Sequence, residues 1–274
     1  MLYKYRNCMD GQERSKRVEG ILRDGDMFFA VPSEFEDIHD CEINVKLDAS
    51  DAKIKKFLSE IENSPDFQGL ENKIENEGWN ENPQKFATLF NRYPGRKTDI
   101  LGICCLCKNP NKVEMWEKYA CNEGICIGYK TRSIYNSPTA IELKERINCG
   151  KFETPYLPFM EVTYKDTGHP AINRLPEVQF LKEIVEVVLT KDNKWSFEEE
   201  CRGIILKEFI GEDINPPGKL MHCSDDAIGE VIFSPWSSTE MIEWVIRLIA
   251  GRPCGINGVE FLRFDGNEIS MLHY

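Results

Sequence analysis

Carboxylates, an arginine and aromatic residues are concentrated in one short segment, residues 195–202 of the 274-residue sequence. If this segment enters a strand near Phe197, every second side chain projects from the same face. Glu198, Glu200 and Arg202 then follow one another at intervals of about 7 Å. Neighbouring carboxylates repel, so one of them has a raised pKa unless the arginine pairs with it. The pattern indicates a carboxylate site; the alternative is a solvated edge strand with an ion pair.

Two other groups of residues are candidates for the same site. Trp116 and Tyr119 are three residues apart, which places them on one face of a helix. That face either packs in the core or presents the tyrosine hydroxyl to a pocket. Lys4 and Arg6 alternate with tyrosines, so a strand there directs both cations to one side. They lie either at the surface or in a cleft, where Arg6 holds an anionic ligand.

The cysteines suggest a metal site at first, because Cys104 and Cys107 form a CxxC motif with Cys121 and Cys126 nearby. Four thiolates at suitable spacing bind zinc. The CxxC motif, however, lies in an apolar run that predicts a strand, where residues three apart face opposite ways. The N-terminus lacks a signal-peptide pattern, which favours a reducing compartment and free thiols. We therefore expect buried core thiols and no metal site.

The overall composition restricts the class of protein. Hydrophobic residues make up 41% and charged residues 29%, as in ordinary globular proteins. The formal net charge of −12 argues against a broad nucleic-acid surface, which needs clustered lysine and arginine, but permits a small basic pocket. No apolar run reaches the length of a membrane span. We expect a cytoplasmic protein.

The elements that must position these residues do not alternate as regular βαβ units. We therefore predict an α+β fold, with a single mixed or antiparallel sheet core and flanking helices. Residues 34–98 are polar, and the spacing of Ile54, Phe57, Leu58 and Ile61 indicates a buried helical face. We expect a helical insertion there, within one domain spanning 1–274. The strands are expected at 2–6, 27–31, 100–108, 124–129, 159–164, 200–205, 229–233 and 261–264, and helices at 113–120, 177–189 and 239–249.

Five motifs in this order resemble an uncharacterised prokaryotic family, domain of unknown function 2971. They are Leu-Tyr-Lys-Tyr-Arg at 2–6, the strand at 27–31 with Pro32-Ser33-x-Phe35, Met115-Trp116-x-x-Tyr119, Gly-Ile-Cys-Ile-Gly at 124–128, and Trp195-Ser-Phe-Glu198-x-Glu200-x-Arg202. The family usually continues after the phenylalanine with Asn-Asp-Pro and an aromatic residue. This chain instead reads Glu-Asp-Ile-His-Asp at 36–40.

The order of the motifs looks more distantly like that of ADP-ribosyltransferases. This resemblance implies NAD as the cofactor, with Glu200 as the catalytic carboxylate and Glu198 preparing the acceptor. Tyr119 would flank the nicotinamide, and Arg6 would hold the phosphate or ribose. The other cofactor-binding residues expected are Lys4, Trp116, Arg202 and Ser33.

The leading hypothesis is an NAD-dependent ADP-ribosyltransferase-like enzyme, a bacterial defence (for example phage defence) or toxin effector. Its partners would be a small-molecule nucleotide and a protein or nucleic-acid acceptor, without a membrane. Nicotinamide leaves as a neutral group, so one carboxylate that stabilises the ribosyl cation suffices. The hypothesis requires that Arg6 and Glu200 share one pocket.

Two alternatives belong to other classes. The first is a non-catalytic module that binds or senses a ligand or a protein. The second is a metal-dependent nuclease that uses Glu198, Glu200 and either Asp37 or Asp40.

Overall fold

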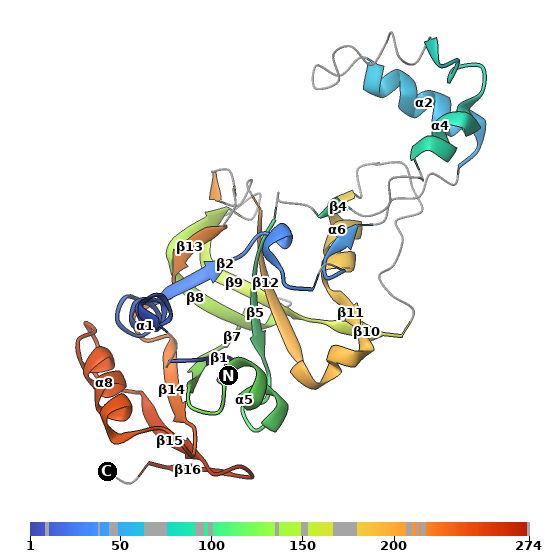
Figure 1. Cartoon of the computed structure of the whole chain (residues 1–274). Helices are drawn as coiled ribbons and strands as arrows, with labels where there is room; N and C mark the ends of the chain where they lie inside the picture. The colour runs from blue at the N-terminus through green and yellow to red at the C-terminus, as the bar shows by residue number, and fades with distance from the viewer. Residues whose placement is uncertain are drawn as a thin grey trace.

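A ten-stranded sheet forms the centre of the computed structural model (Figure 1). The structure describes residues 1–8, 11–37, 39–43, 49–62, 76–90, 96–97, 101–134, 137–148, 153–166, 180–206, 210–211, 214 and 218–272. In spatial order the strands are β16 (Ile269–Met271), β15 (Glu260–Phe264), β14 (Ile228–Phe233), β6 (Ile125–Tyr129), β1 (Leu2–Arg6), β5 (Leu101–Cys107), β12 (Glu200–Leu206), β9 (Glu153–Glu161), β8 (Ser137–Asn148) and β7 (Arg132–Ile134). Within this sheet β14 and β15 pair in parallel and the other neighbours are antiparallel. The predicted mixed sheet is confirmed.

Helices and short strand pairs surround this sheet. The helices are α1 (Gly11–Glu19), η1 (Gly20–Asp24), η2 (Pro32–Glu34), α2 (Asp51–Glu62), α4 (Pro83–Phe90), α5 (Val113–Tyr119), α6 (Phe180–Val188), η4 (Asn193–Glu198) and α8 (Thr239–Ala250). The short pairs are β2 (Asp26–Phe29) with β13 (Lys219–His222), β3 (Glu42–Ile43) with β4 (Arg96–Lys97), and β10 (Thr163–Lys165) with β11 (Thr190–Asp192). None of the helices described combines the length and apolar composition that crossing a bilayer requires.

Most of the predicted elements form where their patterns place them, but β8 was missed. Its glutamates, lysine and arginine favour helices. The register shift between Glu142 and Ile147 also interrupts the alternation that would have identified a strand. Ile141 and Leu143 are nevertheless fully buried in the core. The strand expected at 159–164 is divided at Val162 between β9 and β10.

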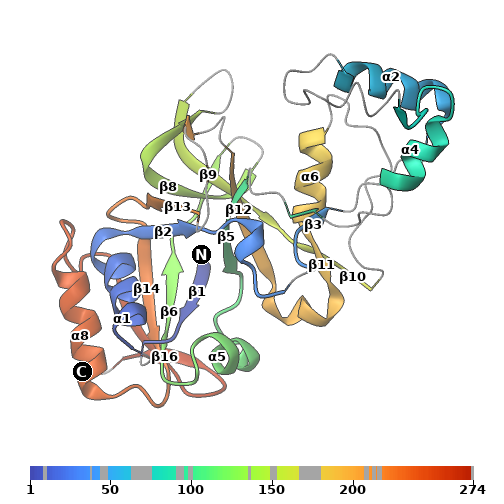
Figure 2. The same ribbon diagram turned by 45° about the horizontal axis from the view of Figure 1, so that its top comes forward.

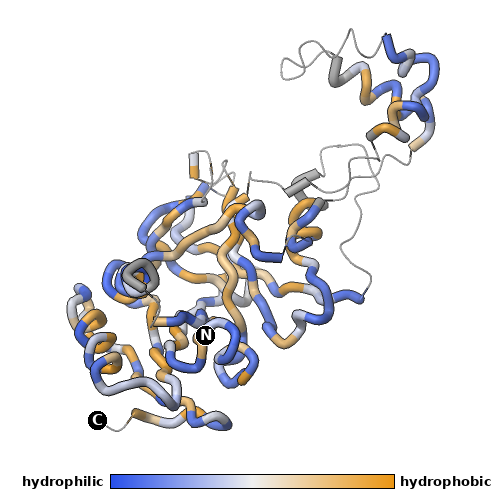
Figure 3. The backbone as a smooth tube through the Cα atoms, in the orientation of Figure 1, coloured by the Kyte–Doolittle hydropathy of each residue, from blue (hydrophilic) through white to orange (hydrophobic). Residues whose placement is uncertain are grey.

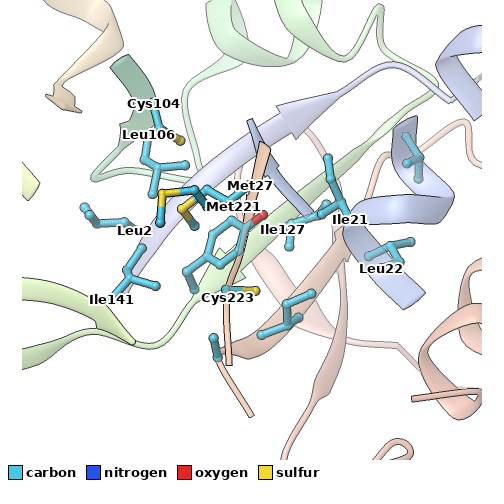
Figure 4. Packing of buried hydrophobic residues seen from close by; sticks show 14 of the residues in the cluster. Leu2, Ile21, Leu22, Met27, Cys104, Leu106, Ile127, Ile141, Met221 and Cys223 are labelled. Carbon is cyan, nitrogen blue, oxygen red and sulfur yellow. The ribbon is translucent and has the colours of Figure 1, made fainter. Parts of the chain in front are cut away.

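The hydrophobic residues follow the central strands, as the coloured tube in Figure 3 shows. The main core packs α1, η1 and α8 against one face of the sheet, and Figure 4 shows Leu2, Ile21 and Cys104 within it. Cys107 belongs instead to a cluster on the opposite face, with Trp116. The prediction that the two thiols of the CxxC motif face opposite ways is confirmed. All cysteines in the described part of the chain are free.

Helices α2 and α4 lie away from the sheet in both views (Figures 1 and 2). They share a small apolar cluster of their own, which contains Ile54, Leu58, Trp79 and Phe86. The predicted helical insertion is therefore present in the segment 34–98, together with the short β3–β4 pair. The side chain of Ile61 lies outside the described residues.

The sheet divides between β1 and β5, near its middle. β1 pairs with β6 along its whole length, and β5 pairs with β12 along its whole length. β1 and β5, by contrast, pair only at Tyr3 and Cys107. Beyond this point the carbonyl oxygen of Cys105 accepts a hydrogen bond from Nζ of Lys4 at 2.6 Å. The two strands thus diverge from a single point of contact. In the space between them, a polar side chain takes the place of the backbone hydrogen bonds.

Candidate functional site

A cavity of about 390 Å³ lies where β1 and β5 diverge. Strands β1, β5, β11 and β12, helix α5, η4 and residues 34–37 and 40 contribute to its walls. Five of the predicted site residues line it together: Lys4, Arg6, Tyr119, Glu198 and Glu200. The condition that Arg6 and Glu200 share one pocket is therefore met by residues almost 200 positions apart in sequence.

Glu200 begins β12, and its carboxylate is bound on both oxygens. Nε of Arg202 donates to Oε1 at 2.8 Å, and Nζ of Lys191 donates to Oε2 at 3.0 Å. The backbone N–H of Glu200 donates to the hydroxyl of Tyr164 at 2.8 Å. Burial raises the pKa of the Glu200 carboxyl, but the charges of Arg202 and Lys191 outweigh this effect and hold the pKa well below its ordinary value. Glu200 is therefore a fixed anion.

Glu198 reaches the cavity from a helix and not from the strand that we expected. Residues up to Glu198 form η4, and Glu199 has a left-handed backbone with φ of 43°. This turn directs Glu199 away, to an ion pair with Lys112 at 2.8 Å. β12 then lies between β5 and β9, so the edge-strand alternative is wrong.

Lys191 on β11 is the centre of a buried cluster of charges. Its Nζ lies 2.6 Å from Glu198, 3.0 Å from Glu200 and 3.5 Å from Asp40. Burial lowers the pKa of Lys191, but the three carboxylates outweigh it and raise the pKa above the ordinary value. The ammonium group thus holds the carboxylates together despite their mutual repulsion.

Arg202 does not contact the cavity, which corrects its predicted role as a cofactor-binding residue. Its side chain is completely buried. Nη2 donates to Asp40 at 2.7 Å, and Nη1 donates to the carbonyl oxygen of Val188 at 2.5 Å, in addition to the contact with Glu200. Because its donors are occupied inside the protein, Arg202 positions Glu200 and Asp40 and is unavailable to a ligand.

Tyr119 and Trp195 form an aromatic and polar side of the cavity. The hydroxyl of Tyr119 donates to Oε1 of Glu198. Nε1 of Trp195 donates to Asp37 at 2.9 Å, and Nζ of Lys118 lies 3.4 Å from the centre of the Trp195 ring. This cation–π contact fixes an aromatic face next to the carboxylates.

Arg6 and Lys4 supply the opposite charge without a carboxylate partner. Among the described residues, the guanidinium of Arg6 makes no hydrogen bond or ion pair, and its Nε is buried. Lys4 donates to the Cys105 carbonyl oxygen, as described above. Burial lowers the pKa of both side chains, and the charge of Arg6 lowers the pKa of Lys4 further. A buried donor without an acceptor is costly, so this part of the cavity favours an anionic ligand.

The segment that carries most of this cluster is the one with a recognisable relationship to other proteins. Residues 115–203 match the family model described as Protein of unknown function (DUF2971). The match runs from α5 to β12 and supports that resemblance for this segment; the motifs at 2–6 and 27–35 lie outside it. No curated protein and no solved structure matches the chain. None of these comparisons supports the resemblance to ADP-ribosyltransferases.

Two predicted cofactor-binding residues lie outside the cavity. Trp116, at the start of the DUF2971 segment, is buried, with its ring stacked on Phe264 and edge-on to Tyr5. It packs in the core because the apolar face of α5 covers the sheet. Ser33, in η2, is exposed and is not part of the cavity wall.

Sequence reasoning missed Lys191, the cation at the centre of the buried charge cluster, which lies within the matched residues 115–203. It is one of 34 basic residues, and nothing in its neighbourhood distinguishes it. Asp40 was considered only as a metal ligand for a nuclease. In the structure Asp40 pairs with Arg202. The ammonium group of Lys191 lies between Asp40 and the two glutamates, Glu198 and Glu200. Within the described residues, no group of acidic, histidine or cysteine side chains is arranged to hold a metal ion.

The depressed pKa of Glu200 predicts a loss of stability in acid. A carboxyl whose pKa is lower in the folded state contributes stability above its unfolded pKa, and this contribution is lost as the pH falls toward the folded pKa. We expect the difference in unfolding free energy between the wild type and Glu200→Gln to shrink as the pH falls from about 5 to about 3. Urea unfolding of both proteins at several pH values measures this difference. A difference that stays constant over this pH range would contradict the lowered pKa of Glu200.

Proposed function

We propose that the chain is an NAD-dependent enzyme of the ADP-ribosyltransferase type, and that the cavity between β1 and β5 is its active site. The observation that carries the proposal is that one cavity is lined by Arg6, whose guanidinium has no partner among the described residues, and by Glu200, a fixed carboxylate. Such an enzyme would modify a protein or nucleic acid as a bacterial defence or toxin effector.

The cations of β1 suit the pyrophosphate of a dinucleotide. A phosphate oxygen would give the buried Nε of Arg6 an acceptor, which none of the described residues provides. Lys4 is on the same side of the strand, two residues away, and adds a further hydrogen-bond donor. Two of the three negative charges of Asp40, Glu198 and Glu200 are already balanced by Lys191 and Arg202, so the carboxylates offset the cations of β1 only partly.

The carboxylates suit the cleavage step. When the bond between ribose and nicotinamide breaks, its electron pair neutralises the nicotinamide nitrogen and positive charge develops on the ribose. Glu200 stabilises this charge, because its low pKa keeps it ionised and Arg202 holds it still. Glu198, oriented by Tyr119 and Lys191, accepts the proton that the attacking acceptor loses.

One observation favours a second function, a ligand-binding or sensor module without catalysis. Both oxygens of Glu198 and both of Glu200 already accept hydrogen bonds within the protein. Carboxylates occupied in this way can define a binding site without reacting. The decisive experiment is nicotinamide release from NAD⁺ by the wild-type chain: release supports the enzyme, and binding without release supports the module.

Binding itself is expected to depend on Arg6. At about 100 times its dissociation constant, NAD⁺ should stabilise the folded wild type by about 2.7 kcal/mol. In Arg6→Gln most of this stabilisation should disappear, because the phosphate loses its charged partner. Thermal unfolding with and without NAD⁺ measures the shift.

The matched control is Arg132→Gln, which changes an exposed arginine outside the cavity. Its shift with NAD⁺ should equal that of the wild type. An equal shift in Arg6→Gln would remove Arg6 from the binding site.

A further inference from the structure

Lys4 has a setting unusual for a lysine, because it faces a cavity without a counter-ion. It lines the gap where β1 and β5 diverge, and its Nζ is held by the carbonyl oxygen of Cys105 at 2.6 Å. Among the residues that the structure describes, no carboxylate forms an ion pair with it. One N–H is bound to the carbonyl, so the ammonium or amine has a fixed position at the wall of the cavity.

The surroundings of Lys4 lower its pKa and so increase the fraction of neutral amine at a given pH. The nearby carboxylates Glu198 and Glu200 are bound to Lys191, as described above. Burial and the charge of Arg6, on the same side of the strand, lower the pKa of Lys4; Cys104, Cys105 and Glu200 oppose this only partly. A neutral amine carries the lone pair that attack on a carbonyl carbon requires.

Arg6 supplies a recognition element at a suitable distance. Residues two apart on a strand lie about 7 Å apart and project to the same side. The buried Nε of Arg6 has no acceptor in the described structure, and a phosphate group would provide one. A small molecule with a phosphate at one end and a carbonyl at the other could therefore contact both side chains.

We propose that Lys4 is a nucleophilic amine that forms an imine with carbonyl compounds whose phosphate group binds to Arg6. The lone pair of Nζ attacks the carbonyl carbon, and the carbonyl oxygen takes a proton from water. Nζ loses one proton to the hydroxide left behind, which gives the neutral carbinolamine. The hydroxyl of the carbinolamine then takes a second proton from solvent and leaves as water, while Nζ releases its second proton to solvent and forms the C=N bond. The step needs no oxidant or reductant. It is separate from nicotinamide release, because it requires Lys4 and Arg6 but neither glutamate.

Pyridoxal 5′-phosphate is a suitable probe, since it contains both an aldehyde and a phosphate. The full chain is incubated with it near neutral pH, the imines are reduced with cyanoborohydride, and the modified lysines are identified by peptide mass spectrometry. We expect Lys4 to be modified about tenfold faster than the exposed Lys53 and Lys55 of α2 in the same sample. Pyridoxal without phosphate should lose this preference, and inorganic phosphate should suppress it.

Variants separate the two roles. Arg6→Gln should remove the preference for Lys4, whereas the control Arg132→Gln should retain it. Modification of Lys4 no faster than that of Lys53 in the wild type would overturn the proposal, and this comparison needs no variant to fold. A preference that survives without the phosphate, or with phosphate in excess, would overturn the role of Arg6. Since no NAD⁺ is present, the result is independent of whether the chain releases nicotinamide.

Discussion

Replacing Arg202 with methionine is expected to lower the free energy of unfolding by about 3–5 kcal/mol. The guanidinium is completely buried and donates to Glu200, Asp40 and the carbonyl oxygen of Val188. Methionine fills much of the volume, but among the described residues it leaves Lys191 as the one buried cation paired with the carboxylates of Glu198, Glu200 and Asp40. An uncompensated charge in the interior is far more costly than the loss of an exposed ion pair.

Arg132→Met is the control for this prediction. Arg132 forms longer ion pairs, of 3.5 Å with Glu142 and 3.8 Å with Asp226, and its side chain is 58% exposed. Exposed pairs of this kind contribute about 0–1 kcal/mol. Urea unfolding near neutral pH compares the two variants. If Arg202→Met lost no more stability than Arg132→Met, the buried cluster would not hold the fold together as described.

The second large effect is expected on activity. If the chain releases nicotinamide from NAD⁺, Glu200→Gln should reduce kcat by about 10²–10³-fold, the usual effect of removing one preorganised charge-stabilising group. Glutamine keeps the size of the side chain but removes the negative charge that would face the developing cation. Nicotinamide release at saturating NAD⁺ measures the effect.

Glu199→Gln is a closely matched control, because Glu199 adjoins Glu200 but pairs with Lys112 outside the cavity. Its activity should remain close to that of the wild type. Both variants are assayed at a temperature at which circular dichroism shows them to be folded. Equal kcat values for Glu200→Gln and the wild type would exclude Glu200 from the chemistry, while an equal loss in Glu199→Gln would indicate a general disturbance of the segment.

Local patterns in the sequence predicted most of the central strands, β8 excepted, and the side to which several of their residues point. Alternation predicted that Lys4 and Arg6 share a side of β1 and that the thiols of Cys104 and Cys107 are on opposite faces of β5. The same logic placed Glu200 and Arg202 on one face of a strand, and in the structure they form an ion pair. These predictions depend only on the backbone geometry of a few neighbouring residues, which the local sequence specifies.

The tertiary structure decided which of these side chains a ligand could reach. Trp116 and Tyr119 share a helical face, yet the ring of Trp116 packs in the core and the hydroxyl of Tyr119 meets Glu198. From the sequence, Arg202 was expected to bind an anionic cofactor. In the structure its guanidinium instead donates a hydrogen bond to Asp40, which is 162 positions away in the sequence.

Lys191 shows most clearly that local sequence patterns do not reveal which side chains meet in the fold. Its importance comes from three carboxylates on different elements, which no local pattern brings together. Charge interactions depend on distance in space and on burial, and both are set by the packing of segments that are remote in sequence. The sequence alone therefore determined the side of the strand for Lys4 and Arg6 on β1 and for Glu200 and Arg202 on β12, and only the fold decided the partners and the charge of each.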